Sequence, residues 1–177
     1  MQPNGPSVQS ACEAALEEML GGEQVRLRAA GRTDAGVHAL EQVVGLRCRT
    51  ERSAEAMVQG LNALLPEDIS CLSAEPVDAS FEPRSWVTRK TYRYRILCRR
   101  SPCPFRGRYT WLKRAPLDED AMEQACRHLV GRHDFSSFRA QRCSAAHPNR
   151  TIESVQIFRR QDELWLEFRG DAFLRHQ

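Results

Sequence analysis

Residues 24–49, QVRLRAAGRTDAGVHALEQVVGLRCR, set two segments containing Val and Leu on either side of a short polar loop. We predict strands at Gln24–Ala30 and Gln42–Arg49, because runs of this composition between turn residues are typical of strands. The loop between them holds an arginine, a threonine, an aspartate and a histidine beside two glycines. The stretch therefore predicts a strand–loop–strand element, whose loop either is an ordinary turn or serves to present Asp34.

Both interpretations of Asp34 fit the composition of the loop. An aspartate side chain is ordinarily a carboxylate at neutral pH, and Arg32 could pair with it and hold its orientation. Gly31 and Gly36 allow unusual dihedral angles and let a substrate approach the backbone closely. The same residues are also typical of a turn in which the aspartate side chain bonds its own backbone. The loop by itself leaves both roles open.

Capping residues and apolar spacing outside this element predict three helices, at 8–20, 54–65 and 117–130. The first two follow Ser7 and Ser53, and serine is a favoured cap at a helix N-terminus. Further strands are predicted at 69–77, 90–99, 109–113, 151–160 and 163–169. The last two alternate apolar and polar residues around Gln161-Asp162, which indicates a hairpin. Its predicted core-facing residues are Val155, Ile157, Leu164, Leu166 and Phe168.

This order of elements predicts an α+β fold, in which antiparallel strands carry helices on one face. We expect two related halves, residues 1–85 with the Asp34 loop and residues 86–177, with a basic cleft between them. No repeat is visible in the sequence itself, so the relation between the halves is an architectural hypothesis.

Composition places the chain among soluble globular proteins. It has 177 residues, of which 41% are hydrophobic and 28% charged, and no apolar run approaches the length of a membrane helix. The start MQPNGPS lacks the features of a signal peptide, and seven cysteines without C-x-x-C spacing favour free thiols, so an intracellular location is expected. Cys98 and Cys103 with His128 or His133 could form a metal site, but we expect neither a metal nor a cofactor.

Charge is distributed very unevenly along the chain. Residues 84–114 contain eleven basic residues and no acidic one, which leaves 15 basic and 23 acidic residues elsewhere, a net charge of −8. The basic residues are Arg84, Arg89, Lys90, Arg93, Arg95, Arg99, Arg100, Arg106, Arg108, Lys113 and Arg114. We call this segment the basic strip; it favours a polyanionic partner over a solvated face without one. Aromatic residues interleave with the basic ones, as suits stacked bases, although each could equally lie in a core.

Several other chemistries lack their signatures. The sequence contains no G-x-S-x-G elbow and no G-x-x-x-x-G-K-[ST] phosphate loop, and Asp34 has no second carboxylate in a clear setting for glycoside hydrolysis. What remains is a lone aspartate beside a basic, aromatic-containing segment.

Six segments of the chain form an ordered set of motifs: SVQSACEAALEEML (7–20), GRTDAGVHA (31–39), LNALLPEDI (61–69), FEPRSWVTRKTYRY (81–94), LVGRHDFSSFRA (129–140) and FRGDAFLRHQ (168–177). In this order they resemble the tRNA pseudouridine synthases of the TruA family. The resemblance implies an isomerase that converts uridine to pseudouridine in tRNA, in the anticodon arm, without a cofactor and as a homodimer. A uridine must leave its stack before a carboxylate can reach it, and phosphate contacts can offset that cost.

The resemblance also implies roles for single residues. Asp34 matches the catalytic aspartate, which attacks the uridine at C1′ or at C6. Arg32 matches the arginine that pairs with this aspartate and fills the space left by the flipped nucleotide, and Tyr92 matches the tyrosine that stacks on the uracil. The motif at 133–138 matches a segment near the bound RNA. The residues expected to contact RNA are Arg84, Arg89, Lys90, Arg93, His133, Phe135 and Arg139.

The chain departs from the family pattern at both ends and at two motifs. The family begins with a strand carrying a G-W-Q-type stretch and continues past the final motif, so we expect this chain to be a fragment or splice variant of a synthase. FEPR replaces the more usual F-x-A-R, and GDAF stands where G-N-A-F is common. The alternatives to an active enzyme are an RNA-binding protein without catalysis and a truncated, poorly folded product.

Overall fold

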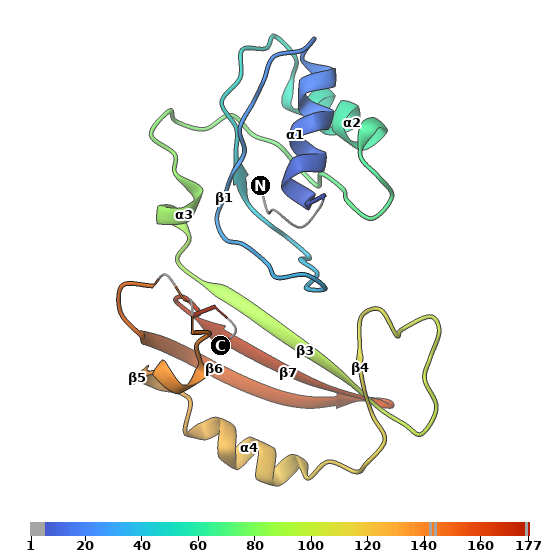
Figure 1. Cartoon of the computed structure of the whole chain (residues 1–177), viewed down its shortest axis with the longest axis vertical. Helices are drawn as coiled ribbons and strands as arrows, with labels where there is room; N and C mark the ends of the chain where they lie inside the picture. Colours follow the sequence, from blue (N-terminus) through green and yellow to red (C-terminus); the bar gives the residue numbers. More distant parts are fainter. Residues whose placement is uncertain (1–5, 142, 144, 176) are drawn as a thin grey trace. The chain divides into compact units, whose positions relative to one another are not determined.

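The computed structural model describes residues 6–141, 143, 145–175 and 177. Residues 1–7, for which we predict no signal peptide, lie partly outside the described residues. The same holds for the final family motif, because it includes His176. The chain divides into two compact units, Met1–Val87 and Thr88–Gln177 (Figure 1). The predicted relation between two halves and the basic cleft between them stay predictions.

The described residues of the first unit, 6–87, form three helices and a short two-stranded sheet (Figure 1). Its elements are α1 (Val8–Met19), β1 (Arg28–Ala29), β2 (Val44–Gly45), α2 (Ala54–Leu64) and α3 (Pro83–Trp86). The two predicted caps are confirmed, because the Ser7 and Ser53 hydroxyls accept hydrogen bonds from the N–H groups of Ser10 and Ala56. The core joins α1, α2 and the chain before β1 through Leu16, Val25, Leu27 and Met57.

The strands of this unit are shorter than the sequence predicts. The N–H of Leu27 donates to the Glu13 carboxylate at 3.0 Å, and its carbonyl accepts from the Gln9 amide at 3.1 Å. Side chains of α1 thus occupy backbone groups that a longer strand would use, and β1 and β2 pair over two residues only. The strand predicted at 69–77 is wrong, because the Asn62 side chain binds both the N–H and the carbonyl of Cys71.

The second unit is a five-stranded sheet with a helix. Its elements are β3 (Lys90–Cys98), β4 (Trp111–Lys113), α4 (Glu119–Arg127), β5 (Gly131–Asp134), the 3₁₀ turn η1 (Ser136–Phe138), β6 (Asn149–Arg160) and β7 (Glu163–Gly170). The strand order is β4-β3-β7-β6-β5. The predicted α+β class and the hairpin are confirmed, whereas β3 and β4 pair in parallel rather than antiparallel fashion. The polar edge strand β5 was not predicted.

The two faces of this sheet differ in chemistry. Helix α4 lies along one face, where Met122 packs with Ile96, Leu164 and Leu166 (Figure 1). Of the predicted core-facing residues, Ile157, Leu164, Leu166 and Phe168 lie in this cluster, and Val155 packs against a neighbouring one. Because side chains alternate along a strand, residues such as Arg95 and its register partner Trp165 lie on the face opposite α4.

Candidate functional site

The loop that connects β1 and β2 presents its residues to solvent. The N–H of Ala30 donates to the Val43 carbonyl at 2.9 Å and closes the base of the loop. Every residue from 32 to 44 is exposed, including Arg32, Asp34 and His38. The loop therefore holds its polar side chains where another molecule can reach them.

Asp34 opens a tight turn within this loop. The N–H of Val37 donates to the main-chain carbonyl of Asp34 at 3.1 Å, and Gly36 has a φ of 83°. A positive φ at the third residue is typical of a type II turn, which favours glycine there. A Cβ at Gly36 would meet nothing within 4 Å, so the backbone angle alone demands the glycine. The hydrogen bond that closes the turn uses the carbonyl of Asp34, not its carboxylate.

The segment FEPR supports the base of this loop. Glu82 forms an ion pair with Arg28 of β1, and Pro83 packs against Gly45 of β2. A Cβ at Gly45 would lie 2.9 Å from the Cγ of Pro83, so this close approach depends on the glycine. Pro83, which stands where the F-x-A-R pattern has alanine, and the neighbouring Glu82 thus both contact the loop's flanking strands. Arg84, on α3, is exposed.

Tyr92 lies on β3, in the second unit. Its ring makes an edge-to-face contact with Phe173 at 4.8 Å between centroids, and its register partner on β7 is Phe168. The side chain is half-buried. This environment fixes the ring position, as a stacking platform requires.

The motif at 133–138 fixes the turn after β5. The Asp134 carboxylate accepts from the Ser136 N–H at 2.8 Å, and hydrogen bonding by Ser136 holds the pKa of Asp134 below its ordinary value. His133 Nε2 donates to the Val130 carbonyl at 2.9 Å. Phe135 is only 3% exposed and packs with Ile152 and Leu174. Direct RNA contact by Phe135 stays a prediction, but in this structure its ring serves the core.

Phe135 is the buried residue of this motif, whereas its neighbours and Arg139, just after η1, are exposed. The N–H of the next residue, Ala140, donates to the Arg175 carbonyl at 2.9 Å and ties the segment to the chain's last described residues. Arg139 is therefore an exposed cation on a tethered segment.

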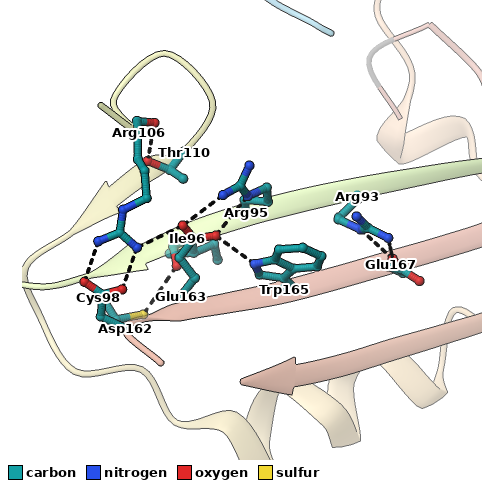
Figure 2. Close-up of polar contacts among 10 residues, drawn as sticks. All are labelled: Arg93, Arg95, Ile96, Cys98, Arg106, Thr110, Asp162, Glu163, Trp165 and Glu167. Carbon is teal, nitrogen blue, oxygen red and sulfur yellow. Dashed lines mark hydrogen bonds and ion pairs between the residues drawn. The ribbon is translucent and has the colours of Figure 1, made fainter. Parts of the chain in front are cut away.

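Acidic residues from the β6–β7 hairpin neutralise much of the basic strip. Figure 2 shows Arg93 paired with Glu167, Arg95 with Glu163, and Arg106 with both Asp162 and Glu163. Within the described part of the chain, five of the eleven basic residues form ion pairs: Arg89, Arg93, Arg95, Arg99 and Arg106. The strip is free of acids in sequence but not in space.

Glu163 is the centre of this arrangement. It is 4% exposed and accepts two hydrogen bonds from Arg95 at 2.9 Å, one from Arg106 at 3.1 Å and one from Trp165 Nε1 at 2.7 Å (Figure 2). Arg95, followed by the other two donors, holds the pKa of Glu163 below its ordinary value despite burial. Asp162 accepts twice from Arg106 and raises the pKa of that guanidinium.

The sequence-based reasoning did not single out Glu163 or Trp165. Both lie on the hairpin that was correctly predicted, and Glu163 stands beside the turn, where an acid is usually solvated. The sequence did contain a signal for this arrangement. The predicted hairpin carries the acids Glu153, Asp162, Glu163 and Glu167, and the predicted strand at 90–99 is rich in arginine.

No metal or membrane-spanning feature is present in the part of the chain that the structure describes. No group of three or more His, Cys, Asp or Glu side chains there could hold a metal ion, which includes the proposed Cys98 and Cys103 site. The helices found there are too short or too polar to cross a bilayer.

Comparison with known proteins gives one family. A family model described as tRNA pseudouridine synthase matches residues 1–84 and 125–177. The chain is 46% identical over 177 residues to tRNA pseudouridine synthase A of Myxococcus xanthus, covering 99% of this chain and 66% of that protein. The corresponding protein of Methylobacterium radiotolerans is 44% identical over 181 residues, with 99% and 71% covered. That of Pelobacter propionicus is 42% identical over 176 residues, with 99% and 72% covered.

Proposed function

Because this chain belongs to the tRNA pseudouridine synthase family, we propose that it isomerises uridine to pseudouridine in tRNA, with Asp34 as the catalytic residue. The chain spans about two thirds of the length of the Myxococcus xanthus protein. The observation that carries the proposal is the exposed glycine-supported turn, which presents Asp34 in the loop GRTDAGVHA.

The reaction balances within one nucleoside. The Asp34 carboxylate forms a C–O bond to the uridine at C1′ or at C6, the bond between N1 and C1′ breaks, and the base rotates. The C–O bond to Asp34 breaks again before the product leaves. A bond forms between C5 and C1′, the C5 proton leaves, and N1 takes up a proton. The carboxylate is released unchanged, so one nucleophile suffices for many turnovers.

The uridine must leave its stack before the attack, which costs a few kcal/mol. We assign Arg32 to the space vacated by the flipped nucleotide and to the orientation of Asp34, and Tyr92 to stacking on the uracil. The contact of Tyr92 with Phe173 supports this assignment, because it holds the tyrosine ring in one orientation.

Phosphate contacts hold the RNA without reading its sequence. The exposed cations Arg84 and Arg139 suit this role, because the ion pairs among the described residues include neither of them. Arg89, Lys90, Arg93 and His133 complete the proposed RNA contacts. We further propose the anticodon arm as the site of modification and a homodimer as the active form, which sedimentation of the purified chain would test.

The decisive experiment is turnover of an unmodified tRNA transcript by the purified chain, with pseudouridine counted per tRNA. We expect product from the native chain and none from Asp34→Ala. Equal RNA binding by both proteins, with product from neither, would instead indicate an RNA-binding protein without catalysis. Product from Asp34→Ala would overturn the assignment of the nucleophile.

A further inference from the structure

A pocket of about 470 Å³ lies at the turn end of the β6–β7 hairpin, within the second unit. Its lining residues are Arg95, Arg106, Arg160, Gln161, Glu163 and Trp165. The volume is in the range of small-ligand pockets. Three guanidinium groups line the pocket beside the Glu163 carboxylate, and Asp162 pairs with one of them, Arg106. One positive charge remains in excess, so the chemistry of the pocket favours an anion.

The carboxylate of the pocket has no capacity left for Arg160. Arg160 stands directly opposite Glu163 in the β6–β7 register, where the two would normally pair. Glu163 already accepts from Arg95, Arg106 and Trp165, and its side chain is 5% exposed. Among the residues that the structure describes, no carboxylate forms an ion pair with Arg160.

Arg160 instead stacks on aromatic rings. Its guanidinium carbon lies 4.5 Å from the Trp165 ring centroid and 5.5 Å from that of Phe158. A cation–π contact uses none of the N–H donors of a guanidinium, and these donors can form a bidentate pair with a phosphate. The aromatic contact therefore positions the charge of Arg160 without using its hydrogen-bonding edge.

Gln161 provides an independent indication of a ligand. It occupies the first position of the two-residue turn with a φ of 54°, the one non-glycine residue of the described chain with a positive φ. Glycine is the usual residue at such a turn position. Glutamine at this position costs backbone strain, but it adds a side-chain amide to the lining of the pocket. That amide can donate a hydrogen bond.

We propose that this pocket binds a phosphate group of the RNA backbone, with Arg160 as the principal contact and Gln161 as a second donor. The RNA is the tRNA of the proposed function, on which this inference rests. Arg95 and Arg106 shape the pocket through their bonds to Glu163 and Asp162, which balance their charges and leave Arg160 as the cation in excess.

The test is tRNA binding by the full chain with Arg160→Gln, over salt concentrations from about 50 to 200 mM. We expect affinity to fall about three- to tenfold and the salt slope to decrease by about one. Arg159→Gln is the matched control. Arg159 is the neighbour of Arg160 in the chain, but it pairs with Glu119 of α4 on the opposite face of the sheet. Arg159→Gln should stay within about twofold of the native chain. Equal affinity and slope for the two variants would overturn the proposal.

A second measurement reports on the pocket itself. Replacing Trp86 and Trp111 by Phe leaves Trp165 as the single tryptophan of the chain. Its emission should change when tRNA is added, and Arg160→Gln should remove that change. No change with tRNA overturns the proposal, and the same change at low millimolar inorganic phosphate would assign the pocket to free phosphate rather than RNA.

These measurements separate the inference from the proposed function. Arg160-dependent binding without any pseudouridine would leave the phosphate site standing and remove the catalytic assignment. If the native chain forms pseudouridine but Arg160→Gln changes neither tRNA affinity nor its salt slope, the catalytic assignment stands and the phosphate site is removed. A native chain that does not bind tRNA at all would overturn the phosphate site.

Discussion

The Asp34 loop and the charged sheet face of the second unit hold their acids in opposite ways. We define the charged face as Arg93, Arg95, Glu163, Trp165 and Glu167 of β3 and β7. The loop is exposed from residue 32 to residue 44, and its turn is set by backbone hydrogen bonding and one glycine. On the charged face, side chains bind one another, and Glu163 is 4% exposed.

The difference matches the roles that we propose, a nucleophile at Asp34 and a structural acid at Glu163. All the strong contacts of Glu163 go to protein donors, so its oxygens have no room for a substrate. A nucleophile must be reachable by its substrate, and Asp34, unlike Glu163, is an exposed residue. We therefore propose that the loop presents the nucleophile, whereas the sheet fixes charges in place.

The strongest test of this contrast replaces the loop acid alone. Asp34→Asn keeps the shape of the side chain but removes the charge of the nucleophile, so turnover should fall at least about 10³-fold. Affinity for tRNA should stay within about threefold, because phosphate contacts supply most of the binding. Single-turnover assays with Asp68→Asn, another exposed aspartate of the first unit, provide the control. Appreciable turnover by Asp34→Asn would remove the distinction between the two acids.

The reciprocal change is Glu163→Gln on the charged face. It leaves Arg95 and Arg106 facing a neutral amide, and breaking a buried ion pair of this kind costs about 2–4 kcal/mol. The expected result is a lower midpoint of urea unfolding, without a specific loss at the active site. Glu123→Gln is the control, since Glu123 and Arg127 form an exposed pair whose loss costs at most about 0.5 kcal/mol. Equal effects of the two substitutions would show that Glu163 is not a structural centre.

The pH dependence of stability sharpens the same point. Hydrogen bonds from Arg95 hold the pKa of Glu163 below its ordinary value of 4.5. The group's contribution is therefore fully present above pH 4.5 and is lost as the pH falls toward the folded-state pKa. Thermal unfolding between about pH 6 and pH 3 should show a smaller loss of stability for Glu163→Gln than for the native chain. Parallel curves would mean that Glu163 does not stay ionised in the folded state.

Local signals in the sequence predicted much of this fold. Ser7 and Ser53 cap their helices as predicted, because capping depends on neighbours within one turn. The hairpin around Gln161 follows from alternation, which is also local. The strand predicted at 24–30 is shortened to Arg28–Ala29, and the one predicted at 69–77 is absent. The side chains of Glu13 and Asn62 bind the backbone there, and such contacts leave no trace in strand periodicity.

The same contrast between local signals and long-range contacts explains which parts of the candidate site could be predicted. The exposed turn with Asp34 follows from its glycines, and its chemistry from the family motif. The pairing of Arg93 with Glu167 joins residues 74 positions apart, so a strip that is purely basic in sequence is half neutralised in space. Long-range pairing of strands decides that outcome, and composition does not encode it.

Partial neutralisation changes what to expect from the basic strip. Charge-neutral replacement of Arg89, Lys90 and Arg93 should weaken tRNA binding about tenfold and flatten its salt dependence. Because Arg89 and Arg93 pair with Glu153 and Glu167, we expect the salt slope to fall by about one to two rather than three. Filter binding at several salt concentrations measures this, with Arg127→Gln on α4 as a control. An unchanged slope would show that β3 does not face the RNA.

The smallest effect concerns the glycine that sets the turn of the loop. Gly36→Ala forces a side chain into a φ of 83° without any steric clash, so the cost is the backbone strain of about 1 kcal/mol. Because the loop is exposed, we expect this cost to shift the turn rather than unfold the chain, and turnover to fall about fivefold. Asparagine tolerates positive φ better than alanine, so Gly36→Asn should retain more activity at equal tRNA affinity. Full activity of Gly36→Ala would mean that Asp34 works without this turn, and the contrast between a backbone-set loop and a side-chain-set sheet would fail.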